Sequence, residues 1–210
     1  SSVTTRISVS SAKSDLAVWL LRVLVVETAV AEGKIGVIAG GSVALAVDAG
    51  NDEDEGRAVL EAARSTERPE IRLVYTHGHA DHIAGNDLWA DRTGAPVVMH
   101  RLDWEFFRRP EMQAEAQAEG FPPLTRVDLP VADGHLLPLG AWQAQVIHTP
   151  GHTPGAVCLY FPGHLFTGDT LFVEAAGRTD LPGGSLEQLI QSLQEKIMPL
   201  PDDTRVWPGH

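Results

Sequence analysis

One ten-residue segment constrains this chain more than any other. Residues 76–85 read Thr-His-Gly-His-Ala-Asp-His-Ile-Ala-Gly, which places three histidines and an aspartate within six consecutive positions. Imidazole nitrogens and carboxylate oxygens are the ligands that zinc, iron and manganese take in proteins. The apolar run at 71–75 predicts a strand that ends where these side chains begin. The segment therefore predicts a metal site on a loop that joins a strand to a helix.

The spacing within this segment indicates two metal centres. His77 and His79 are two positions apart, so an extended backbone directs both side chains the same way. Asp81 and His82 are adjacent, and their side chains must diverge. One pair is therefore expected to serve one metal and the other pair a second metal.

Three later segments also place histidine or aspartate in turn-like surroundings. They read Thr-Pro-Gly-His-Thr-Pro-Gly at 149–155, Phe-Thr-Gly-Asp-Thr-Leu-Phe at 166–172 and Trp-Pro-Gly-His at 207–210. With His-Gly-His-Ala-Asp-His at 77–82, and in this order, they resemble the motifs of the metallo-β-lactamase-fold hydrolases. The resemblance implies an α/β fold, an αββα sandwich of two mixed sheets flanked by helices, with the site between the sheet edges.

The resemblance also implies a ligand set for two divalent cations, expected to be zinc, with iron or manganese as alternatives. A hydroxide held between the two metals is the expected nucleophile. Asp81 is expected to orient this water and relay its proton. The first metal would be bound by His77, His79 and His152, the second by Asp81, His82 and His210, and Asp169 would bridge them.

The segment at 177–184, Gly-Arg-Thr-Asp-Leu-Pro-Gly-Gly, narrows the resemblance. It is similar to the short bacterial glyoxalase II-like proteins, which hydrolyse acyl thioesters such as hydroxyacylglutathione. The expected partner is accordingly a small anionic thioester. Arg178 could bind the substrate carboxylate, or it could pair with Asp180 and shape the loop. The aspartate at 169 argues against the zinc β-lactamases that use a cysteine ligand.

A second reaction class stays open from the sequence. Persulfide dioxygenases resemble glyoxalase II in sequence and in the Gly-Arg-Thr-Asp loop at 177–180, but they use a single iron, which His77, His152 and Asp169 would hold here. Hydrolysis of lactones or β-lactams on the same fold is a further alternative.

Composition restricts partners and compartment. The formal charge of −12 argues against nucleic acid and anionic membranes, because phosphates are bound mainly by Lys and Arg. The longest apolar run, at 16–26, contains Arg22 and is too short for a membrane helix. The single cysteine, Cys158, cannot form an internal disulfide and is expected to be a buried structural thiol. These features favour a cytoplasmic protein, with residues 1–210 as one domain. His210 is the last residue, so a further tail is suspected.

The remaining pattern alternates strands and helices. Expected strands are 18–27, 34–39, 43–47, 95–99, 127–129, 135–138, 142–148, 157–161, 165–166 and 204–207, and expected helices are 52–65, 101–120 with a break at Pro110, and 185–197. Asp48 is interpreted either as a brace beneath the metals or as a simple turn residue. His100 is interpreted as structural, His148 as a residue supporting a ligand loop, and Trp104, Phe106 and Phe107 as core rather than groove wall.

Overall fold

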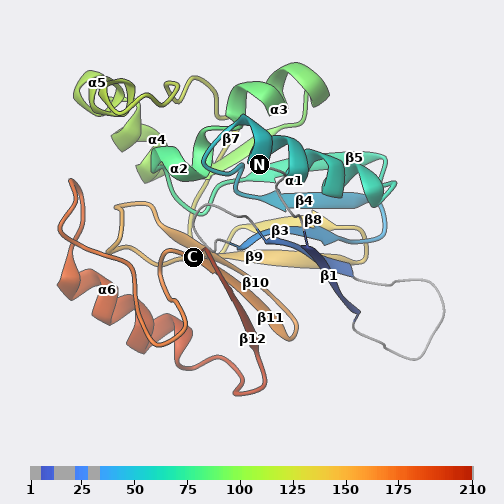
Figure 1. Ribbon diagram of the computed structural model, residues 1–210. Coiled ribbons are helices and arrows are strands. Elements are labelled where there is room, and N and C mark those ends of the chain that lie inside the picture. The colour runs from blue at the N-terminus through green and yellow to red at the C-terminus, as the bar shows by residue number, and fades with distance from the viewer. Residues whose placement is uncertain (1–5, 12–21, 28–33, 210) are drawn as a thin grey trace.

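Two β-sheets packed face to face form the centre of the molecule, and helices cover both outer faces (Figure 1). This computed structural model describes residues 6–11, 22–27 and 34–209. The expected αββα sandwich is confirmed. The first part of the strand predicted at 18–27 lies outside the described residues, and its second part is a strand.

The first sheet has seven strands in the order β1-β2-β3-β4-β5-β6-β7. Neighbours from β1 to β4 are antiparallel, and neighbours from β4 to β7 are parallel. The expected hairpin at Gly40 and Gly41 joins β3 to β4, with Gly40 N donating to the Val43 carbonyl. The strands are β1 (Arg6–Ser11), β2 (Arg22–Glu27), β3 (Lys34–Ala39), β4 (Val43–Val47), β5 (Glu70–Val74), β6 (Val97–His100) and β7 (Leu129–Val131).

The second sheet has five strands in the order β12-β11-β10-β9-β8. Its pairs are antiparallel except for β11 and β12, which are parallel with an irregularity between Phe166 and Gly168. The strands are β8 (Leu136–Leu139), β9 (Trp142–His148), β10 (Val157–Phe161), β11 (His164–Gly168) and β12 (Arg205–Pro208).

Strand β4 shows how the layers arise from side-chain alternation. Val43, Leu45 and Val47 pack into the core between the two sheets, where side chains of both sheets meet. Ala44 and Ala46 point the other way, into the core beneath helix α1 (Glu53–Ser65). Alternate residues of a strand face opposite sides of a sheet, so a strand buried on both faces is apolar throughout.

The helices complete the outer layers. On the seven-stranded sheet, α1 is capped by Asp52, whose side chain accepts a hydrogen bond from Glu55 N at 2.9 Å. On the other sheet, α6 (Leu186–Ser192) continues into a π-helical turn, η1 (Leu193–Ile197). The remaining helices are α2 (Ala80–Ile83), α3 (Asn86–Thr93), α4 (Arg101–Phe107) and α5 (Pro110–Ala118). The predicted break at Pro110 thus separates α4 from α5. In the described part of the chain, no helix combines the length and apolarity that crossing a membrane requires.

Strand β7 lies two residues later than the predicted strand at 127–129. The reason is Asp128, which makes backbone and side-chain hydrogen bonds to Val97 at the point where β7 joins β6. Pro130 is tolerated within β7 because this strand forms the edge of the sheet.

Candidate metal centre

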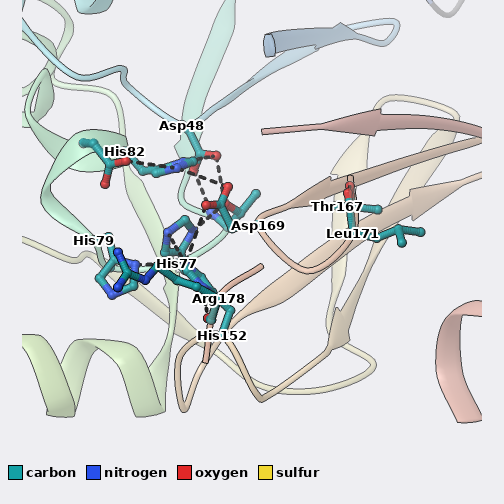
Figure 2. A network of polar contacts seen from close by, with 12 residues as sticks. Asp48, His77, His79, His82, His152, Thr167, Asp169, Leu171 and Arg178 are labelled. Carbon is teal, nitrogen blue, oxygen red and sulfur yellow. Dashed lines mark hydrogen bonds and ion pairs between the residues drawn. The ribbon is translucent and has the colours of Figure 1, made fainter. Parts of the chain in front are cut away.

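Three histidines from two loops converge beyond the ends of the strands (Figure 2). His77 and His79 follow β5, and His152 follows β9. Nε2 of His152 lies 2.9 Å from Nδ1 of His79 and 3.3 Å from Nε2 of His77. Nitrogens bound at 2.0–2.1 Å to one tetrahedral zinc are about 3.3 Å apart. The spacing of this first cluster therefore fits one metal ion.

Two imidazoles of the first cluster, those of His79 and His152, favour the neutral form. Burial and the neighbouring His152 lower the pKa of His79 to about 4. Burial also lowers the pKa of His152, although the Arg178 carbonyl accepts a hydrogen bond from its Nδ1 at 2.8 Å. Neutral histidine is the form that binds a metal, because the lone pair of the facing nitrogen is available.

A second cluster shares His77 with the first and adds His82 and Asp169. Asp169 lies between the clusters: its Oδ1 is 3.4 Å from His82 Nε2, and its Oδ2 is 3.6 Å from His152 Nε2. Asp81 reaches the same place, with Oδ2 3.8 Å from His82 Nε2, while 41% of its side chain stays exposed. The Asp169 carboxylate, because it lies between the clusters, can be shared by two cations.

Asp48, the residue after β4, supports both clusters through hydrogen bonds. Its carboxylate accepts hydrogen bonds from Thr76 N at 2.7 Å and Thr76 Oγ1 at 2.8 Å, and lies 3.1 Å from His82 Nδ1. Thr76 Oγ1 in turn lies 3.2 Å from His77 Nδ1. Burial alone would lower the pKa of His82, but Asp48 and Asp169 together raise it well above its usual value. Asp48 is therefore a brace rather than a simple turn residue.

His210 lies outside the described residues, so its predicted ligand role stays a prediction. The preceding glycine nevertheless comes close to the site. A Cβ on Gly209 would lie 2.6 Å from Asp169 Oδ1 and 3.2 Å from His82 Cε1. Its N–H donates to the Gly168 carbonyl at 2.9 Å. Only a residue without a side chain fits there.

A fully buried aspartate that the sequence did not single out ties the ligand loops together. Asp103, on α4, accepts hydrogen bonds from Gly78 N, Thr153 Oγ1 and Gly155 N. Burial raises its pKa to about 7, and these three hydrogen bonds oppose the shift. In the sequence, Asp103 resembles any acidic residue in the first turn of a helix, so no local signal could have identified it.

Arg178 contributes to the site through its backbone. Its carbonyl holds His152, while its exposed guanidinium makes two hydrogen bonds with Asp180, at 2.7 and 2.8 Å. The pairing with Asp180 is thus the conformation observed. Binding of a substrate carboxylate by Arg178 stays a prediction.

Three other interpretations can be compared with the structure. Cys158 is fully buried, and burial raises the pKa of its thiol to about 11, which fits a structural residue. His148 lies outside both clusters: its Nε2 is 2.9 Å from the Pro154 carbonyl, and its ring stacks on His100 at 4.1 Å. Phe107, itself partly buried, packs against the buried core and also contacts the ligand loop at Gly78, so it belongs both to the core and to the wall of the site.

Taken together, the donors are consistent with two divalent cations: the imidazoles of His77, His79 and His152 form one set, and His82 with Asp81 forms a second, with the Asp169 carboxylate between them. The αββα sandwich with such a site at its strand ends defines a class of metal-dependent hydrolases. The chain belongs to the metallo-beta-lactamase superfamily, whose family model matches residues 32–210.

Known proteins of this superfamily differ in what their names state. The "Probable metallo-hydrolase YqgX" of Bacillus subtilis is 30% identical over 160 residues, covering 74% of this chain and 75% of that protein. Human mitochondrial "Persulfide dioxygenase ETHE1" is 36% identical over 146 residues, covering 67% of this chain and 50% of that protein. The crystal structure of TTHA1623 "in a di-iron-bound form" has a TM-score of 0.66 and 32% identity, covering 93% and 89% of the two chains.

Proposed function

We propose that the protein hydrolyses acyl thioesters of a small anionic thiol, hydroxyacylglutathione among them, with two divalent cations as cofactors. The observation that carries the proposal is the second set of donors, Asp81 and His82 beside Asp169, which a single metal ion would not use. The loop at 177–184 is attached to the first cluster and supports the choice of substrate. This loop resembles that of glyoxalase II-like proteins, and the Arg178 carbonyl holds His152 in place. The loop is therefore part of the wall of the centre.

Each group of residues would have a separate role in the reaction. His77, His79 and His152 would hold one cation, and Asp81, His82 and His210 the other, with Asp169 between them. Bound cations supply Lewis acidity and lower the pKa of water. Asp81, half exposed beside His82, can accept a proton from the attacking water and release it to solvent. A thiolate leaves without being protonated, so the reaction needs no further acid.

The alternative is persulfide oxygenation at a single iron. It is supported by the similarity to human ETHE1 and by the proximity of His77 and Asp169 to His152, the two histidines and one carboxylate that one iron would use. The second set of donors favours hydrolysis, because a mononuclear centre leaves Asp81 and His82 without a role.

Metal content together with a substrate panel tests the proposal. Elemental analysis of protein purified without added metal should give two ions per chain, falling to one in His82→Ala. S-lactoylglutathione and other thioesters should be hydrolysed faster than a homoserine lactone or a β-lactam. One iron per chain, unchanged by His82→Ala, together with oxygen consumption on glutathione persulfide that exceeds thioester hydrolysis, would replace the hydrolase by the dioxygenase.

A further inference from the structure

A cavity of about 110 Å³ opens beside His79, between the ligand loop and helix α5. Figure 1 shows α4 and α5 at the end of the molecule where α2 lies. The cavity wall combines the loop at 78–80, α2, the end of α4, one face of α5 and the loop at 181–182. Its apolar side chains include Ile83, Phe107, Met112, Ala116, Leu124 and Leu181. His79, a candidate metal ligand, thus forms part of the wall of this cavity.

The charges around the cavity are of one sign. Glu115 and Glu119, both exposed on or just after α5, belong to its lining, and no Lys or Arg is among the described residues that line it. Gln113 is occupied by a hydrogen bond from its Nε2 to the Phe107 carbonyl. A group that enters here meets apolar walls and two carboxylates, which would repel an anion.

We infer that this cavity binds the acyl part of the substrate, and that this acyl part is an uncharged aliphatic group. The inference rests on the proposed thioester hydrolysis and specifies which thioesters the protein would prefer. The thiol carrier, which is anionic in glutathione and in coenzyme A, does not suit a cavity flanked by Glu115 and Glu119. It would lie outside, on the side of the exposed Arg178.

The size of the cavity sets the length of the acyl group. An apolar cavity of roughly 150 Å³ holds a benzene-sized molecule. By proportion, the space beside His79 holds roughly four to five carbons, so with the carbonyl carbon outside the cavity it suits an acyl chain of about five to six carbons. Each buried methylene should raise kcat/KM about fourfold, since burial of apolar area is the only new interaction.

The first test is a series of thioesters of one thiol, N-acetylcysteamine, with straight acyl chains from two to twelve carbons. We expect kcat/KM to rise about fourfold per added methylene up to about six carbons, and then to level off or fall. Glutaryl thioester, which ends in a carboxylate, should be hydrolysed at least about tenfold more slowly than the uncharged pentanoyl thioester. A series without dependence on chain length overturns the inference.

A matched pair of substitutions on α5 locates the effect. Ala116→Leu places three added carbons in the cavity and should reduce the ratio of hexanoyl to acetyl kcat/KM by about tenfold or more. Ala118→Leu makes the same change on the exposed surface of the same helix, away from the cavity, and should leave this ratio unchanged. Equal ratios in the two variants would contradict the assignment.

Binding without turnover separates this inference from the proposed function. S-hexyl-N-acetylcysteamine, a thioether that cannot be hydrolysed, should bind to the metal-loaded protein in calorimetry with a negative heat-capacity change. Ala116→Leu should weaken this binding about tenfold, and Ala118→Leu should not. Binding as predicted with no thioester hydrolysis would reject the proposed function and keep the apolar cavity as a ligand site. Thioester hydrolysis with no binding of the thioether would reject the cavity alone.

Discussion

Two buried aspartates support the candidate metal centre, and they do so in different ways. Asp48, at the end of β4, contacts the ligand side chains: it meets His82 directly and His77 through Thr76. Asp103, on α4, contacts the main chain around the ligands, at Gly78 and Gly155, together with the hydroxyl of Thr153. One carboxylate thus acts on the charge and orientation of imidazoles, and the other on the path of two loops.

Because of this difference, we expect loss of Asp48 to affect metal affinity and loss of Asp103 to affect the stability of the fold. A carboxylate that touches a ligand histidine makes its imidazole more basic and fixes its ring, so its loss should appear first in metal binding. A carboxylate that holds loop amides should appear first in stability, because its loss leaves buried donors unpaired. Substitutions at the two positions and at other residues of the site test whether the two carboxylates differ in this way.

The largest effect is expected for Asp81→Asn. It removes the group that would take a proton from water, and should lower thioester turnover by about a hundredfold or more. The first metal ion should be retained, because Asp81 lies beside His82 rather than within the three-histidine cluster. Steady-state kinetics and elemental analysis measure both. Cys158→Ser is the control and should keep the rate nearly intact, since this thiol is buried and protonated. Full activity in Asp81→Asn would remove Asp81 from the mechanism.

Asp48→Asn should weaken binding of the metal ion at His82 by about ten- to a hundredfold, the usual range when a partner of a ligand histidine is lost. Competition with a chelator gives the two affinities. The ion held by His77, His79 and His152 should be affected less, because Asp48 reaches that set only through Thr76. Equal weakening of both ions would show that Asp48 does not distinguish the clusters.

Asp103→Asn should lower the free energy of unfolding by about 1–3 kcal/mol, because an amide can accept from only some of the three donors and leaves one facing its own NH2 group. Denaturant unfolding of the metal-free protein measures this loss. The matched control is Asp128→Asn, whose side chain is 34% exposed and accepts one backbone hydrogen bond, from Val97 N, so that its replacement should cost less. Equal losses in the two variants would contradict the role of Asp103.

The smallest effect is expected for Arg178→Ala. Its carbonyl keeps its hydrogen bond to His152, and the exposed pair with Asp180 contributes little to stability. If Arg178 binds the carboxylate of the carrier equally in the ground and transition states, KM should rise several-fold while kcat stays nearly constant. Kinetics with anionic and neutral thiol carriers tests this. Without any preference for the anionic carrier, only the contact with Asp180 remains for Arg178.

By itself, the sequence determined the class of fold and the candidate ligands that lie close together in it. Local patterns predicted single elements: the strand before the histidines, helix α1 after its cap Asp52, and the break between helices at Pro110. The resemblance of four short segments to the motifs of the family implied seven ligands, and for His77, His79, Asp81, His82, His152 and Asp169 the structure brings the side chains together.

Only the tertiary structure decided which groups support and surround those ligands. Asp103 is separated from Gly155 by 52 residues in the chain, and the apolar cavity is assembled from α2, α4, α5 and a loop beyond residue 180. The position of β7 depends on hydrogen bonds between Asp128 and Val97, which are 31 residues apart. Such contacts form only when the sheets and helices pack together. The sequence of a short segment does not specify which distant residues will contact it.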